Sequence, residues 1–131
     1  MVLAINTLDL LPIYEQLRDQ IILGIASKQL KPNEPLPSVR RMAADLGINF
    51  HTVNKAYTAL CDDGYIKMDR RKGALVANTM PPTEGFKVQL ARKMLIIAAE
   101  AICHRMSKEE FTAFCENIYT KAQGVKKEEN L

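Results

Sequence analysis

The sequence lacks the cysteine patterns that stabilise small disulfide-rich proteins or hold structural zinc. It contains three cysteines, Cys61, Cys103 and Cys115, and no two of them are spaced as Cys-x-x-Cys. An odd number of cysteines without this spacing indicates neither a disulfide framework nor a zinc knuckle. Reduced thiols in the cytoplasm are therefore the simplest interpretation.

Long apolar runs are missing too. The most apolar run, residues 94–102, is far too short to span a bilayer, and charged residues flank it. The first residues contain no basic segment and no small-residue cleavage site, so they do not resemble a secretion signal. We expect a cytoplasmic protein with no membrane partner.

The motifs of common enzyme and metal sites are also absent. There is no glycine-rich phosphate loop, no His-Glu-x-x-His and no Gly-x-Ser-x-Gly, and neither His51 nor His104 has an evident nucleophile as partner. Glu100 and His104 lie one helical turn apart near Cys103 and Cys115, but nothing completes a set of three or four ligands. We expect no catalytic residue, no metal and no cofactor, and we interpret the cysteines as structural.

What the sequence does contain is typical of a globular protein. Its 131 residues allow one ordinary domain, or one small domain with an appendage. Apolar residues make up 47% of the chain and charged residues 25%, a balance that argues against disorder. The net charge of +3 permits nucleic-acid binding but does not argue for it, because the clustering of charges decides.

Three helices are expected in the first half of the chain. Apolar residues at helical spacing predict a helix from Pro12 to about Gln29, since proline suits the first helical position. Three prolines within residues 32–37 forbid a helix there and predict an ordered turn. Helical patterns then span Val39–Leu46 and Phe50 to about Asp63.

The ends of these helices have the residue types that favour helix boundaries. Ser38 and Asn49 provide side-chain oxygens that accept from free backbone N–H groups at a helix start. Gly47 suits the left-handed position that ends a helix. The expected inner faces are Ile13, Leu17, Ile21, Gly24 and Ile25 in the first helix, Val39, Met42, Ala43 and Leu46 in the second, and Val53, Ala56, Tyr57 and Leu60 in the third.

Past residue 64 the pattern changes from helix to strand and then back to helix. Short strands at 65–68 and 74–77, joined by the charged turn 69–73, predict a β-hairpin. Helices are then expected from Phe86 to Met106, apolar on most sides, and from Ser107 to about Gln123. Ser107 and Glu110 form a capping box between them.

These elements predict a mainly α protein with a small β-hairpin. We expect a winged helix-turn-helix domain in residues 1–78 and a linker in residues 79–84. A helical dimerisation segment should occupy residues 85–124, followed by a charged tail in residues 125–131.

The helices 39–46 and 50–63, joined through Gly47, form a helix-turn-helix. The second helix of such a pair enters the major groove of DNA and reads bases with its N-terminal residues. Apart from Phe50, the outward positions there are polar, and no acidic residue occurs before Asp62, as contacts to base edges and phosphates require. Phe50 has two readings: it packs locally, or it touches a thymine methyl group.

Basic residues on both sides extend this surface. Arg40 and Arg41 begin the preceding helix, and Arg41 is the better candidate for a purely solvent-facing residue. Arg70, Arg71 and Lys72 occupy the hairpin turn, where they form either a DNA-contacting wing or a solvated turn. The residues that we expect to bind DNA are Ser38, Arg40, Arg41, Asn49, Phe50, His51, Thr52, Asn54, Lys55, Tyr57, Arg70, Arg71, Lys72 and Gly73.

Residues 10–78 resemble the GntR family of bacterial transcription regulators, with several motifs in the family's order. The motifs are Pro12-Ile13-Tyr14-x-Gln16-Leu17, Leu36-Pro37-Ser38-Val39-Arg40-x-Met42-Ala43, Leu46-Gly47-Ile48-Asn49-x-x-Thr52-Val53-x-Lys55-Ala56-Tyr57-x-x-Leu60, Gly64-Tyr65-Ile66 and Gly73. The short C-terminal part resembles the YtrA-like branch, whose C-terminal helices dimerise. The resemblance implies operator binding as a dimer, mostly as a repressor.

The resemblance also implies roles for single residues. Arg40 would contact phosphate or base, Asn49, His51, Thr52 and Lys55 would face the operator, and Gly73 would sit at the wing tip. Asn33 replaces a glycine of the family, and the turn should survive because asparagine tolerates positive φ. Phe50 and Asn54 replace arginines found in many members, which leaves the base preference open.

The partners that we expect are double-stranded operator DNA and a second copy of the chain. The C-terminal helices present more apolar surface than one short hairpin can bury, so they are expected to pair. The residues expected in this contact are Phe86, Leu90, Met94, Ile97, Ala101, Phe111, Phe114 and Ile118. A small-molecule effector at the dimer interface or between the two parts of the chain is a further hypothesis.

A protein–protein adaptor that binds no DNA is the alternative function, because winged helices also serve in that role. An adaptor would favour apolar anchors on the face around residues 49–55 and 70–72, and only Phe50 is such a residue. The sequence therefore favours DNA binding.

Overall fold

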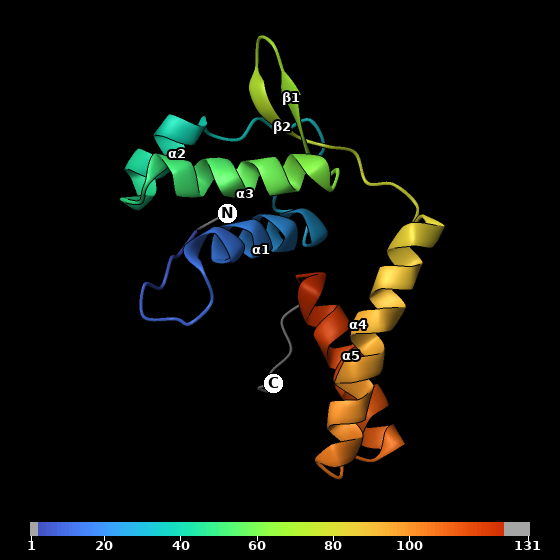
Figure 1. Cartoon of the computed structure of the whole chain (residues 1–131). Coiled ribbons are helices and arrows are strands. Elements are labelled where there is room, and N and C mark those ends of the chain that lie inside the picture. Colours follow the sequence, from blue (N-terminus) through green and yellow to red (C-terminus); the bar gives the residue numbers. More distant parts are fainter. Residues whose placement is uncertain (1–2, 125–131) are drawn as a thin grey trace. The chain divides into compact units, whose positions relative to one another are not determined.

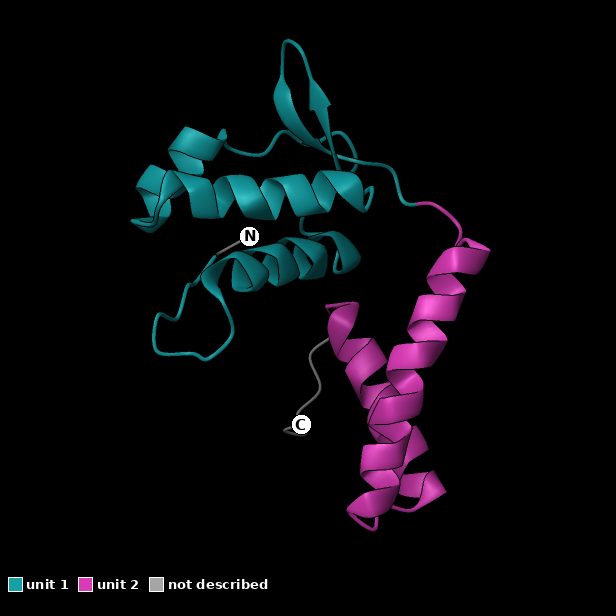
Figure 2. Ribbon diagram, viewed as in Figure 1, with its two compact units in different colours: residues 1–79 teal, residues 80–131 magenta. Residues whose placement is uncertain are grey.

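The computed structural model describes residues 3–124, which form five helices and one two-stranded antiparallel sheet (Figure 1). The chain divides into unit 1, residues 1–79, and unit 2, residues 80–131 (Figure 2). Unit 1 contains α1, α2, α3 and the β1–β2 hairpin, and unit 2 contains α4 and α5. The predicted charged tail, residues 125–131, lies outside the described residues.

Helix α1 (Ile13–Ala26) forms the base of unit 1 and lies alongside α3 (Figure 1). It ends three residues earlier than the expected Gln29, because Lys28 adopts a positive φ of 64°. This backbone conformation stops the helix and turns the chain, so that the N–H of Leu30 donates to the carbonyl of Gly24. The predicted apolar face is present, with Leu17 and Ile21 fully buried.

Helices α2 (Val39–Leu46) and α3 (Phe50–Asp62) begin and end almost where the sequence predicts. The Ser38 hydroxyl accepts from the N–H of Arg41 at 3.1 Å, and the Asn49 side chain accepts from the N–H of His51 at 2.8 Å. Gly47 has a φ of 66° at the end of α2, a conformation that costs glycine little because it lacks a Cβ atom. The three predicted boundary residues are thus confirmed.

Strands β1 (Ile66–Asp69) and β2 (Gly73–Val76) form the predicted hairpin, shifted by one residue at each strand. Ile66 pairs with Val76 and Asp69 with Gly73. The proline-rich segment before α2, expected to be only a turn, also pairs with β2. The N–H of Leu36 donates to the carbonyl of Ala74, and the N–H of Val76 donates to the carbonyl of Glu34. Residues 34–36 therefore add a third extended segment to the sheet, beside β2.

Unit 1 has one apolar core between its helices and its sheet. The core consists of residues from every element, and the predicted inner faces supply most of it. Its buried members are Leu17, Ile21, Leu30, Leu36, Met42, Ala43, Val53, Ala56, Tyr57, Leu60, Ile66, Ala74 and Val76. This core fixes α2 and α3 against each other and sets the hairpin beside them.

Unit 2 consists of α4 (Glu84–Cys103) and α5 (Lys108–Ala122). Helix α4 begins two residues before the expected Phe86, because the Thr83 hydroxyl caps it by accepting from the N–H of Phe86. It ends three residues before the expected Met106, where Arg105 takes a φ of 60°. The predicted capping box of Ser107 and Glu110 opens α5. No side chain of residues 80–124 is buried.

Within residues 3–124, no helix is long and apolar enough to cross a membrane.

Candidate nucleic-acid interface

The α2–turn–α3 unit is built by local hydrogen bonds around Gly47. Beyond this glycine, the N–H of Ile48 donates to the carbonyl of Ala43 at 3.1 Å, which folds the turn back on α2. Met42 and Ala43 on α2 and Val53 on α3 are buried in the shared core. The two helices are therefore held as a rigid helix-turn-helix, and α3 presents its other side to solvent.

The solvent side of α3 contains most of the residues predicted to read DNA. Phe50, His51, Asn54 and Lys55 are exposed, and Thr52 is half-buried. The buried residues Val53 and Ala56 alternate with them, as the helical period requires. The structure thus brings five predicted contact residues together on one face of a helix whose start is uncovered.

Asn49 and Ser38 already have hydrogen-bond partners as caps. The Oδ1 atom of Asn49 accepts from His51, and the Oγ atom of Ser38 accepts from Arg41. Each oxygen therefore orients the first turn of its helix. The Asn49 amide NH2 group is the part of that side chain with donors left for a base edge or a phosphate.

Phe50 connects α2 to the start of α3. Its ring is 41% exposed and lies 5.8 Å from the Arg40 guanidinium carbon. The His51 ring meets it edge-on, with 5.6 Å between the centroids. Local packing, one of the two readings of Phe50, is therefore observed, and it holds Arg40 over the N-terminus of α3. Contact with a thymine methyl group remains a prediction.

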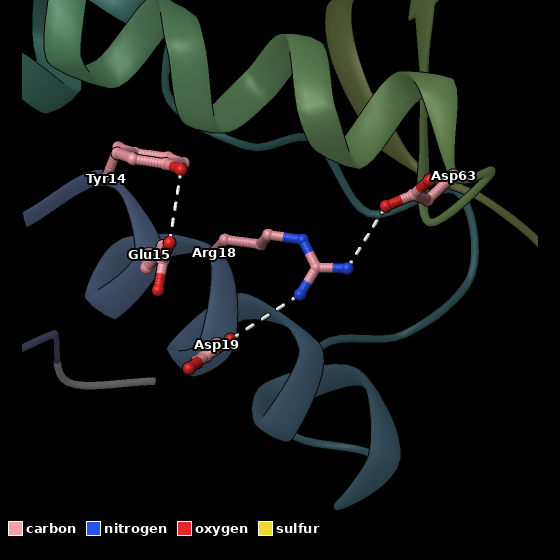
Figure 3. A network of polar contacts seen from close by, with 5 residues as sticks. All are labelled: Tyr14, Glu15, Arg18, Asp19 and Asp63. Carbon is pink, nitrogen blue, oxygen red and sulfur yellow. Dashed lines mark hydrogen bonds and ion pairs between the residues drawn. The ribbon is translucent and has the colours of Figure 1, made fainter. Parts of the chain in front are cut away.

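Lys55 has an aromatic neighbour that the sequence reading did not include in the site. Its Nζ atom lies 4.0 Å from the centroid of the Tyr14 ring, which α1 supplies. The Tyr14 hydroxyl donates to the Glu15 carboxylate at 3.1 Å, and this bond raises the pKa of Tyr14 (Figure 3). The cation–π contact restricts Lys55 to one side of α3. The sequence signals for Tyr14 were its position in the first turn of α1 and its place in the motif Pro12-Ile13-Tyr14-x-Gln16-Leu17.

Tyr57 is a correction to the predicted contact set. The sequence placed it both in the core and among the DNA-binding residues, and the structure places it in the core, with only 3% of its surface exposed. Its hydroxyl donates to the Pro37 carbonyl at 2.7 Å, and burial raises the pKa of Tyr57 to about 12. The residue anchors α3 to the chain segment before α2, and it has no surface left for DNA.

The hairpin turn presents three basic side chains to solvent. Arg70, Arg71 and Lys72 are all exposed. The Asp69 carboxylate accepts from the backbone N–H groups of Arg71 and Lys72, at 2.8 and 3.0 Å, and these bonds lower the pKa of Asp69. The turn is therefore shaped by a local Asx motif that leaves the basic side chains free.

The family resemblance implied that Gly73 lies at the tip of the wing, but the structure places it elsewhere. It is the first residue of β2 and pairs with Asp69, and its φ of 76° gives the bend that closes the turn. Asn33 has a φ of 66°, so the predicted tolerance for positive φ is confirmed. Its Oδ1 atom accepts from the Lys67 ammonium at 2.7 Å, and this bond links the proline-rich segment to β1.

The two arginines at the start of α2 differ in their surroundings. Arg41 forms an ion pair with Asp45 at 3.5 Å, one helical turn on, and both side chains are more than half exposed. Arg40 has its guanidinium over the Phe50 ring. Arg40 is therefore oriented toward α3, and Arg41 is partly compensated by an acidic neighbour.

A polar network joins α1 to the far end of α3 (Figure 3). Arg18 contacts Asp63 at 3.0 Å and Asp19 at 3.5 Å, and its guanidinium lies 5.9 Å from the Tyr65 ring centroid. Because the carboxylates of Asp19 and Asp63 are about half exposed, such pairs contribute only about 0.2–1 kcal/mol each. The network orients the two helices more than it stabilises them.

The residues predicted to dimerise all lie on α4 and α5. Six have between 43% and 51% of their surface exposed: Phe86, Leu90, Met94, Ile97, Phe114 and Ile118. Ala101 and Phe111 are half-buried. In the described part of the chain, α4 and α5 included, no three His, Cys, Asp or Glu side chains gather as a metal site would require.

Comparison with known proteins places this geometry among transcription regulators. The family described as bacterial regulatory proteins, gntR family, matches residues 13–76. The uncharacterized HTH-type transcriptional regulator YhcF of Bacillus subtilis is 33% identical over 84 residues, which are 64% of this chain and 69% of YhcF. The HTH-type transcriptional repressor YtrA of the same organism is 29% identical over 118 residues, which are 88% of this chain and 91% of YtrA.

Among solved structures, the fold is similar over nearly the whole chain to a transcriptional antiterminator from Listeria monocytogenes EGD-e. That crystal structure has a TM-score of 0.88 and 25% sequence identity, and the match covers 99% of this chain and 98% of the other. The similarity therefore extends through both units.

Proposed function

This chain belongs to the GntR family of bacterial regulatory proteins, and on that premise we propose that it is a repressor that binds an inverted-repeat operator as a homodimer. Members of the family are transcription regulators with a DNA-binding domain, and they are not enzymes. Repression is supported by the similarity to the repressor YtrA over most of both chains. We propose the cytoplasm as the place of action.

The observation that carries the proposal is the exposed start of α3. Its outward side chains include His51, Asn54 and Lys55, which can donate to base edges and phosphates. Arg40 stands over the same helix start through its contact with Phe50. An adaptor surface would instead expose apolar anchors, and Phe50 is the one such residue on this face.

The basic hairpin turn supplies the second contact. Arg70, Arg71 and Lys72 have no carboxylate within ion-pair distance among the described residues. The one acidic side chain in the turn, Asp69, accepts backbone N–H groups of the turn. A phosphate backbone is the partner that best matches three exposed cations on one turn, and such contacts position a protein without reading sequence.

Dimerisation is supported by the lack of a buried core in the described residues of unit 2. Helices α4 and α5 hold 20 and 15 residues, yet no side chain of residues 80–124 is buried. Helices with this much exposed apolar surface need a partner to cover it. A second copy gives two recognition helices related by a two-fold axis, which match two half-sites about 34–36 Å apart or a multiple of that distance.

A small-molecule effector at the dimer interface is a subsidiary hypothesis, motivated by the same exposed apolar surface. Calorimetry of the purified protein with candidate metabolites tests it. Heat of binding together with a changed operator affinity supports an effector, and no heat with an unchanged affinity counts against one.

The experiment that tests the main proposal is selection of random duplex DNA on the purified full chain, followed by affinity measurements at several salt concentrations. We expect an inverted-repeat sequence bound about 10³-fold or more tighter than random DNA. Its affinity should fall steeply with salt because phosphate contacts release counterions. An enriched sequence without two-fold symmetry would overturn the proposal that the protein binds DNA as a homodimer.

Failure to enrich any sequence, from a protein that is folded and dimeric, would favour the adaptor function. Repetition of the selection in the presence of candidate effectors separates that outcome from a regulator that binds only with its ligand.

A further inference from the structure

Helix α4 has more apolar surface than one neighbouring helix can cover. At about 100° per residue, its apolar residues fall on two faces whose centres are roughly 140° apart. The first face is the stripe predicted from the sequence, Phe86, Leu90, Met94, Ile97 and Ala101. The second face, which we call the Leu95 seam, comprises Val88, Ala91, Leu95, Ala99 and Ile102. The remaining side of the helix is mostly polar.

The Leu95 seam is the less covered of the two faces. Leu95 is 70% exposed and Ile102 is 73% exposed, whereas Leu90 and Met94 on the first stripe are each 43% exposed. Ala101, also on the first stripe, is half-buried. The first stripe is therefore the one nearer to α5, and the seam needs a partner from outside its own hairpin.

The seam is symmetric about Leu95 along the sequence. Val88 and Ile102 each stand seven residues from Leu95, and Ala91 and Ala99 each stand four residues from it. If two copies of α4 cross antiparallel at Leu95, each branched residue meets a branched residue and each alanine meets an alanine. A two-fold axis requires a self-complementary surface of this kind. The alanines also let the helix backbones approach closely on both sides of the axis.

We propose that the Leu95 seam pairs with the same seam of a second copy, with α4 antiparallel to its mate and the two-fold axis at Leu95. The proposal rests on the homodimer proposed above and specifies which face makes its centre. The first stripe of α4 then remains available to α5 helices at the flanks. Both apolar faces of α4 are covered in this arrangement, and its polar side stays in water.

Antiparallel pairing also sets the distance between the two helix starts that lead to the DNA-binding units. Glu84, the first residue of α4, stands eleven residues from Leu95. At 1.5 Å per residue, the two Glu84 positions are about 33 Å apart along the paired helices. Parallel pairing would bring the two starts together instead.

Single-cysteine crosslinking of the full chain tests the proposal. The three native cysteines are replaced by serine, and cysteine is introduced at one seam position at a time under mild oxidation. Leu95→Cys should crosslink to itself, because a disulfide needs Cα atoms about 4.4–6.8 Å apart. Val88→Cys and Ile102→Cys should not crosslink alone, because antiparallel copies hold each about 21 Å from its mate. A mixture of these two variants should form a heterodisulfide.

Ile96→Cys is the matched control. Ile96 neighbours Leu95 on the same helix and is 60% exposed, but it lies on the polar side of α4. It should stay reduced under conditions that crosslink Leu95→Cys. Crosslinking of both residues to the same extent would indicate random collision and would overturn the seam.

The other outcomes are distinguishable. Self-crosslinking of Val88→Cys would overturn the antiparallel arrangement in favour of a parallel one. A dimer by analytical ultracentrifugation without a Leu95→Cys crosslink would overturn the seam and leave the homodimer standing. A protein that is monomeric at all concentrations would overturn both.

Charge exchange at the axis provides a test that needs no oxidation. Leu95→Glu and Leu95→Lys each place like charges face to face and should be monomeric when purified separately. Mixing them should restore the dimer, because opposite charges then meet at the axis. Helix content by circular dichroism checks that each variant is folded, and a mixture of folded monomers that stays monomeric would contradict the proposal.

Discussion

Replacement of Tyr57 by phenylalanine separates a packing role from a DNA-contacting role. The ring stays in the core, and the change removes only the hydroxyl that donates to the Pro37 carbonyl at 2.7 Å. Loss of this part-buried hydrogen bond costs about 0.5–1.5 kcal/mol of unfolding free energy. For a unit of this size, the midpoint of thermal unfolding should fall by about 4–8 °C per kcal/mol.

The pH dependence of the free energy of unfolding provides a second test of the same role of Tyr57. Burial raises the pKa of Tyr57 from its ordinary value of 10 to about 12. The unfolded chain therefore loses this proton first, so the contribution of Tyr57 is complete below pH 10 and is lost as the pH rises toward 12. Between pH 9 and 11 the parent protein should lose about 1 kcal/mol that the phenylalanine variant does not lose. The stability gap between them should narrow accordingly.

The assay is urea unfolding followed by far-ultraviolet circular dichroism, because the chain contains no tryptophan. Both proteins are measured at the same concentration, since the proposed dimerisation would make stability depend on concentration. Operator affinity is measured in parallel below the unfolding transition and should change by less than about threefold, or 0.7 kcal/mol. A loss of more than about tenfold in affinity with unchanged stability would refute the assignment of Tyr57 to the core.

Three further predictions concern the interface and the N-terminal segment. Arg71→Ala or Lys72→Ala should weaken binding equally for all DNA sequences and reduce the slope of log affinity against log salt by about 1 per lost phosphate contact; a change in sequence preference alone would contradict this role. His51→Ala should change the preferred sequence at about 1–3 kcal/mol per lost base contact, as measured on single-base operator variants, and equal weakening on every variant would exclude base reading. Gln16→Met should lower the unfolding free energy by about 1–3 kcal/mol. It should also speed proteolytic cleavage before Pro12, because the buried Gln16 amide binds the backbone of Asn6 and Leu11; cleavage at the parental rate would show that this tether is dispensable.

The sequence by itself determined the features that depend on a few neighbouring residues. The caps at Ser38, Asn49 and Ser107 and the left-handed turn at Gly47 follow from side-chain chemistry within one helical turn. The tolerance of Asn33 for positive φ has the same local origin. These features set the positions of α2 and α3, and so the face of α3 that is predicted to read DNA.

Only the tertiary structure decided which side chains lie on the exposed face of α3. The helical period placed Tyr57 on the inner face of α3, while the predicted contact set also included it; the core holds the ring, and its hydroxyl donates to the Pro37 carbonyl, 20 residues earlier. Tyr14 joins the face only because α1 packs against α3 and brings its ring under Lys55. The segment at Glu34 and Leu36 becomes a sheet edge only where β2 returns beside it. Each of these contacts joins residues at least 20 positions apart, so chain folding, and no local propensity, determines which partners meet.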